Sequence, residues 1–213
     1  MTPHSYLSTL IARYPVLAPL EAEIYGAFSL LEQAFSAGHK LIIGGNGGSC
    51  ADAEHIAGEL MKGFVLPRSL TEEMQQHLLA VDPERGAVLA RSLQQGLPCI
   101  ALSSHPALNT AFLNDVDGGL MFAQQLSVLG NPGDVFLAIS TSGNSQNIYD
   151  AAVAAKAKGM AVLALTGKSG GQLKTIADLS LIMPSNETYM IQELHLPVYH
   201  CLCLMLEQAF FGD

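Results

Sequence analysis

The feature that most constrains this chain is a series of five short, uninterrupted apolar runs separated by longer segments of helical pattern. The runs lie at residues 40–45, 97–103, 134–140, 161–167 and 178–185. A continuous apolar run predicts a strand that is buried on both faces, as in a parallel sheet. The helical patterns lie at about residues 49–62, 72–95, 106–129, 144–158 and 188–209. This alternation predicts a doubly wound α/β sandwich with five parallel strands and helices on both faces.

Two segments lie outside this alternation. Residues 1–39 precede the first strand and include a predicted extra helix at 17–37, which packs either on the chain's own sheet or against a neighbouring subunit. Residues 63–96 form a long connection, in which we expect a helical excursion that is either a substrate lid or an elaborated crossover. At 213 residues, the chain is predicted to form a single domain over 1–213.

Composition excludes several classes of function. The chain has 10 Lys and Arg against 19 Asp and Glu, a formal net charge of −9, so we expect no binding to nucleic acid. Apolar stretches are too short for a membrane span, so we expect no membrane association. The N-terminus lacks the pattern of a secretory signal, and the four cysteines form no CxxC pair. These features predict a cytoplasmic protein with reduced thiols.

Two polar loops each follow a predicted strand and open a predicted helix. Their sequences are GGNGGS at residues 44–49 and STSGNS at residues 140–145. Glycine lets the backbone approach a ligand closely, and a helix N-terminus offers N–H groups to an anion. One such loop alone is more simply explained as a helix cap. Because ligands of an open α/β sheet gather at the carboxyl ends of its strands, two such loops predict a site for a phosphate monoester.

A second group of polar residues lies on two predicted helices. His55 and Glu59 are four residues apart and therefore share one helix face. Gln192 and His200 are eight apart, which places them within about 80° of each other on a helix. Two imidazoles, a carboxylate and an amide oxygen are able to bind a divalent ion such as zinc, or to position protons without a metal.

The second of these helices leaves two questions open. His195 competes with His200 as the histidine that faces a site. Pro197 lies between them and is expected to kink the helix, because proline lacks the backbone N–H of a regular turn.

Four motifs occur in order over roughly residues 40–207: GGNGGSCADAEHIAGEL, GDVFLAISTSGNSQN, ALTGKSGGQL and IQELHLPVYH. In this combination the chain resembles the sugar isomerase (SIS) domain family, and within it the phosphoheptose isomerases. The resemblance implies an α/β SIS fold and the conversion of sedoheptulose 7-phosphate to D-glycero-D-manno-heptose 7-phosphate through an enediol. This is an early step towards the heptose of lipopolysaccharide.

The resemblance also implies roles for individual residues. Glu59 is the expected base and His200 the expected acid. The residues expected to hold a zinc ion are His55, Glu59, Gln192 and His200. The residues expected to bind the substrate and its phosphate are Asn46, Gly47, Gly48, Ser49, Ser140, Thr141, Ser142, Ser145 and Gln192. A homotetramer with active sites shared between subunits is implied as well.

Two alternatives accompany the isomerase hypothesis. One is an isomerase for another ketose phosphate, because His105 stands where the family has an aspartate and Tyr189-Met190 stand where it often has Asp-Arg. The other is a non-catalytic SIS tetramer that binds a partner protein, as a replication-initiation factor similar to this family does. Retention of the four expected metal ligands favours the enzyme, because a scaffold has no chemical need for them.

Overall fold

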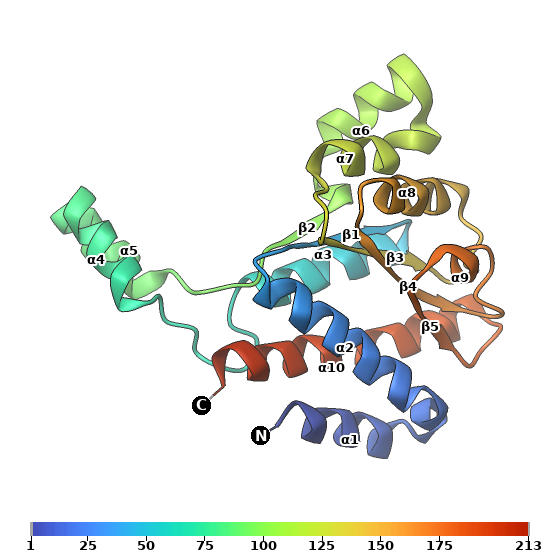
Figure 1. Ribbon diagram of the computed structural model, residues 1–213, viewed down its shortest axis with the longest axis horizontal. Coiled ribbons are helices and arrows are strands. Elements are labelled where there is room, and N and C mark those ends of the chain that lie inside the picture. The colour runs from blue at the N-terminus through green and yellow to red at the C-terminus, as the bar shows by residue number, and fades with distance from the viewer. Residues whose placement is uncertain (1, 213) are drawn as a thin grey trace.

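The computed structural model describes residues 2–212, and these contain one five-stranded parallel sheet in the order β2-β1-β3-β4-β5 (Figure 1). The strands are β1 Leu41–Gly45, β2 Cys99–Ala101, β3 Val135–Ser140, β4 Ala161–Gly167 and β5 Leu179–Met183. Each lies within one of the predicted apolar runs, so the prediction of five buried parallel strands is confirmed. No helix in the described part of the chain is long and apolar enough to cross a membrane.

Helices cover both faces of the sheet because alternate strand residues enter two separate apolar cores. Leu41 and Ile43 of β1 belong to one core, whereas Ile42 between them belongs to the other. The first core is covered by α2 Glu21–Ser36, α3 Gly48–Met61 and α10 Thr188–Phe211. The second is covered by α7 Met121–Leu129, α8 Gln146–Ala157 and the short α9 Leu173–Ile176.

The N-terminal segment differs from the prediction of one helix at 17–37. A 3-10 helix, Pro15–Leu20, contains Pro19 and delays the start of α2 to Glu21. A further helix, α1 Pro3–Arg13, precedes it; α1 begins with a capping box between Thr2 and Ser5 and packs against α10. The buried side chains of α2 lie in the chain's own core, as expected for a helix that packs on the chain's own sheet.

The prediction of one continuous helix was wrong for two segments, because turn-forming residues divide each of them into two helices. Residues 72–95 form α4 Glu72–Val81 and α5 Pro83–Ser92, because Pro83 starts a new helix and the Asp82 carboxylate caps it. Residues 106–129 form α6 Pro106–Phe112 and then α7, separated by a π-helical segment, Leu113–Asp117, and a 3-10 turn, Gly118–Leu120. The α4–α5 hairpin extends away from the sheet (Figure 1).

A buried ion pair anchors the first residues of the connection that carries this hairpin. The Glu207 carboxylate near the end of α10 accepts hydrogen bonds from the backbone N–H groups of Phe64, Val65 and Leu66, at 2.7–3.2 Å. It also accepts 2.8 Å bonds from Arg68, whose side chain is fully buried with it. Burial alone raises the pKa of Glu207, but these hydrogen bonds outweigh it and hold the pKa below its ordinary value.

Arg68 also ties the connection to the end of α3. Its guanidinium donates to the carbonyl oxygens of Leu60 at 2.7 Å and Glu59 at 3.2 Å. Carbonyls in the last turn of a helix have no partner within the helix, so Arg68 supplies the missing donors. The end of α3 and the end of α10 are therefore held together by one buried pair.

We predict that Glu207→Gln lowers the free energy of unfolding by about 3–5 kcal/mol, because it leaves the Arg68 guanidinium buried without a counter-charge. Urea unfolding followed by circular dichroism measures the change. Lys156→Gln is the matched control: it breaks the exposed 2.7 Å pair with Asp178 and is expected to lose less than about 1 kcal/mol. Equal losses in the two variants would contradict the assignment of the buried pair as an anchor.

Candidate active site

The two polar loops lie next to each other at the carboxyl edge of the sheet. β1 and β3 are neighbouring strands, with Gly45 opposite Ile139, and β2 lies on the other side of β1. The chain thus winds in opposite directions from β1, and such a switch point is where α/β sheets bind ligands. The side-chain amides of Asn46 and Asn147 exchange two 2.9 Å hydrogen bonds and join the loops. Asn147 was not among the predicted site residues.

Both loops lead into helix N-termini that carry no side-chain cap among the described residues. The N-cap of α3 is Gly47, with φ +55°, and Ser145 at the N-cap of α8 makes no capping hydrogen bond. The Ser145 hydroxyl instead lies 2.9 Å from that of Ser140. The simpler explanation of these loops as side-chain helix caps is therefore not supported. Two uncapped N-termini at one edge suit an anion.

The remaining predicted loop residues lie around the same edge. Ser49 is buried in the first turn of α3, and Ser142 accepts a 3.1 Å hydrogen bond from the Asn144 N–H. Gln192 lies against the first loop, since a Cβ added to Gly48 would stand 2.5 Å from its Nε2 atom. Gln192 is about 12 Å along α10 from His200, so in this conformation it belongs with the loop residues.

A second polar cluster forms where α3 packs against α10. His55 Nε2 lies 3.3 Å from Glu59 Oε1, and Lys62 Nζ lies 3.1 Å from the other oxygen of Glu59. The rings of His55 and His200 are 5.0 Å apart and nearly perpendicular. The structure therefore brings together the expected base, the expected acid and a further imidazole.

Two further residues of this cluster were missed by the sequence analysis. The Tyr199 hydroxyl lies 3.0 Å from His55 Nδ1 and donates a 3.2 Å hydrogen bond to Asp52. Asp52 precedes His55 by one helical turn, and Tyr199 precedes His200 directly. That spacing was the available signal, but the contact depends on how α3 and α10 pack.

Burial sets the electrostatics of the cluster. It lowers the pKa of His200, with a further contribution from His55, and so favours the neutral imidazole. It raises the pKa of Asp52 and, together with the Asp52 charge, that of Tyr199. Tyr199 and Asp52 are therefore both less readily ionised here than in water.

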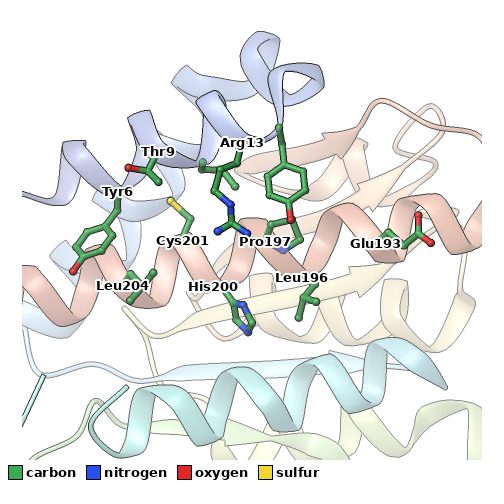
Figure 2. Close-up of a pocket in the computed structure, with 11 residues that line it drawn as sticks. Tyr6, Thr9, Arg13, Glu193, Leu196, Pro197, His200, Cys201 and Leu204 are labelled. Carbon is green, nitrogen blue, oxygen red and sulfur yellow. The ribbon is translucent and has the colours of Figure 1, made fainter. Parts of the chain in front are cut away.

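His195 does not compete with His200 for this site. Its side chain is fully buried, its Nε2 lies 3.2 Å from the Thr166 carbonyl oxygen, and burial lowers its pKa to about 4. The helix α10 continues through Pro197 without interruption. In Figure 2, His200 points from α10 away from α1, and α1 and α10 border a groove of about 220 Å³.

The donors of the cluster fit a divalent ion in type. His200 Nε2 is buried and has no hydrogen-bond partner among residues 2–212, as an unused ligand nitrogen would be. Two imidazoles and a carboxylate suit a borderline ion such as zinc. In the described chain, however, no three His, Cys, Asp or Glu residues are already gathered at metal-binding distances. A bound ion therefore requires side-chain adjustment.

His105, which stands where an aspartate was expected from the family resemblance, contacts α7. Its Nδ1 lies 2.8 Å from the side-chain oxygen of Gln125, which is buried on α7. Together with Glu54 it borders a hollow of about 330 Å³ between α3 and β2.

Comparisons with known proteins identify the family to which the chain belongs. A SIS domain family model matches residues 85–167. The phosphoheptose isomerase of Trichlorobacter lovleyi is 38% identical over 195 residues, which cover 92% of this chain and 86% of that protein. This chain belongs to the phosphoheptose isomerase family. The family resemblance carried by the sequence motifs is thereby confirmed.

Solved structures of this family support the same assignment. Phosphoheptose isomerase GmhA from Neisseria gonorrhoeae is 30% identical with a TM-score of 0.73, and a phosphoheptose isomerase from Francisella tularensis is 32% identical with a TM-score of 0.76. Each comparison covers 96% of both chains. The predicted SIS fold is confirmed, and the alternative of a partner-binding SIS protein is not favoured.

We predict that Gly143→Ala weakens the binding of inorganic phosphate at least tenfold, about 1.4 kcal/mol. Gly143 has φ +67°, and an added Cβ would overlap the carbonyl oxygen of Gly170, so the second loop must move. Gly38→Ala is the matched control, because φ is +79° there but the added Cβ meets open space. An NMR titration with phosphate measures both affinities. Unchanged affinity in a folded Gly143→Ala protein would contradict the anion site.

Proposed function

We propose that this member of the phosphoheptose isomerase family interconverts sedoheptulose 7-phosphate and D-glycero-D-manno-heptose 7-phosphate. The observation that carries the proposal is that Glu59 on α3 and His200 on α10 both lie against His55, at 3.3 Å from its Nε2 and at 5.0 Å between ring centres. The relatives named phosphoheptose isomerase support it over most of the chain. The substrate class follows from an anion site and an acid–base pair in one protein.

The two loops are proposed to anchor the phosphate. Hydroxyls of Ser140, Thr141, Ser142 and Ser145 and the amides of two helix N-termini offer hydrogen bonds without adding positive charge. This suits a chain whose net charge is −9. Binding energy from the phosphate then orients the reacting end of the sugar, as in other enzymes that hold a remote group.

The isomerisation itself needs a base at carbon and an acid at oxygen. We assign the base to Glu59, which takes a proton from the carbon next to the carbonyl and returns it to the neighbouring carbon. His200 donates a proton to the carbonyl oxygen as the cis-enediol forms, and it accepts the proton of the hydroxyl on the neighbouring carbon as that carbon becomes the new carbonyl. The partly buried Glu59 carboxylate, with 15% of its side chain exposed, is shielded from water but open to a ligand.

A zinc ion is proposed to be held by His55, Glu59 and His200, with Gln192 as a fourth ligand after its side chain turns from the first loop. When bound, such an ion supplies positive charge that stabilises the enediolate oxygen. His200 Nε2 supports this proposal, because it is buried and has no hydrogen-bond partner within residues 2–212.

We further propose a homotetramer with shared active sites in the cytoplasm. His55 has 41% of its side chain exposed in the single chain, so a neighbouring subunit has room to complete the site. All four cysteines are free, which supports a reducing compartment. Light scattering is expected to give four times the chain mass. A fully active monomer would contradict shared sites.

We predict that Glu59→Gln and His200→Ala each lower kcat at least 100-fold while the fold is retained, because each removes one partner of the proton transfers. Product formation is followed by NMR with sedoheptulose 7-phosphate. Glu54→Gln is the control on the same helix; it is expected to retain kcat within about threefold, as ordinary surface changes do. Normal turnover by Glu59→Gln would contradict the assignment of the base.

A further inference from the structure

The contact between Tyr199, Asp52 and His55 has a consequence for where His55 carries its proton. Tyr199 has one hydroxyl hydrogen, which it donates to the Asp52 carboxylate at 3.2 Å. The same oxygen lies 3.0 Å from His55 Nδ1 and is therefore left to accept. A hydrogen bond between these two atoms then requires the hydrogen to be on Nδ1.

The second ring nitrogen of His55 is then unprotonated in the neutral ring. Nε2 lies 3.3 Å from Glu59 Oε1, on the side of the ring that faces the acid–base pair. Two lone-pair atoms at this separation repel unless a cation lies near both. A positive ion close to both His55 Nε2 and Glu59 Oε1 would therefore be stabilised by their lone pairs.

We propose that Asp52 and Tyr199 are positioning residues that hold His55 in its Nδ1–H form, so that Nε2 presents a lone pair to a divalent metal ion. The ligand role of His55 rests on the proposed function, whereas the position of the proton is a property of the protein alone. Hydrogen bonds to the second nitrogen of a ligating histidine fix its ring orientation in this way in other metal proteins.

The hydrogen bonds of the Tyr199 hydroxyl can be tested separately from the packing of its ring. Tyr199 is 3% exposed, and its ring packs against those of His55 at 5.5 Å and His200 at 5.0 Å. Phenylalanine at this position keeps both ring contacts and removes only the hydroxyl. Tyr199→Phe therefore tests the hydrogen bond with little change in the core.

Two variants distinguish the direction of the hydrogen bonds. Tyr199→Phe removes the acceptor for His55 Nδ1. Asp52→Ala instead frees the tyrosine hydroxyl to donate to Nδ1, which favours the opposite, Nε2–H form. Tyr149→Phe is the matched control, because Tyr149 packs against the core on the other face of the sheet.

The experiment combines nitrogen-15 NMR of the metal-free full chain with zinc affinity measured against a chromophoric chelator. The wild type is expected to show His55 protonated on Nδ1, Asp52→Ala on Nε2, and both site variants 10–100-fold weaker zinc binding. Tyr149→Phe is expected to match the wild type in both measurements. Circular dichroism confirms that each variant is folded.

Other results overturn the proposal. These are a wild-type His55 protonated on Nε2, an Asp52→Ala protein with the wild-type proton position, or zinc affinity that is unchanged in both site variants or absent from the wild type. Turnover of sedoheptulose 7-phosphate is measured separately. A protein that fails to turn over the sugar but shows the expected tautomers and zinc affinities contradicts the proposed function and leaves this inference standing.

Discussion

The packing of α3 against α10, fastened by the buried Glu207 carboxylate, is the constraint on which the candidate site depends. Through Arg68, Glu207 reaches the carbonyl oxygen of Glu59, the proposed base. Glu207 also follows His200, the proposed acid, by seven residues, or two turns on one helix face. One buried pair thus fixes the relative position of two helices that each supply one half of the proton-transfer machinery. The long connection between α3 and β2 begins at this pair, so its elaboration leaves the site intact.

The phosphate-binding proposal depends on geometry rather than on net charge. An acidic chain repels a phosphate at long range, yet two helix N-termini beside β1 and β3 place backbone N–H groups at one edge. The Asn46–Asn147 amide pair keeps those two loops in register. On this proposal, the sugar extends along α3 from this edge towards His55, which lies about 9 Å beyond Ser49 on a helix. The proposed phosphate site and the proposed base, Glu59, therefore lie on the same helix, α3.

Much of this arrangement could be predicted from the sequence because it is encoded locally. Continuous apolar runs gave all five strands, and the two loops and the His55–Glu59 spacing follow from short motifs. Pro83 and Gly118 interrupt two of the predicted helices. Both residues are turn signals, but a prediction that relies on apolar periodicity alone ignores them. The contact between Tyr199 and Asp52 could not be predicted, because these residues are 147 positions apart in the sequence and meet only when α3 and α10 pack together. Sequence spacing places residues on a helix face, but the partner of that face is set by the tertiary fold.

The most direct test of the proposed isomerisation is the incubation of purified protein with sedoheptulose 7-phosphate, with and without added zinc, followed by NMR of the product. We expect accumulation of an aldose heptose 7-phosphate, with exchange of the proton on the carbon next to the carbonyl. Absence of both turnover and proton exchange in a folded, zinc-loaded oligomer would contradict the proposed activity, because Glu59 and His200 would then have no action on this sugar.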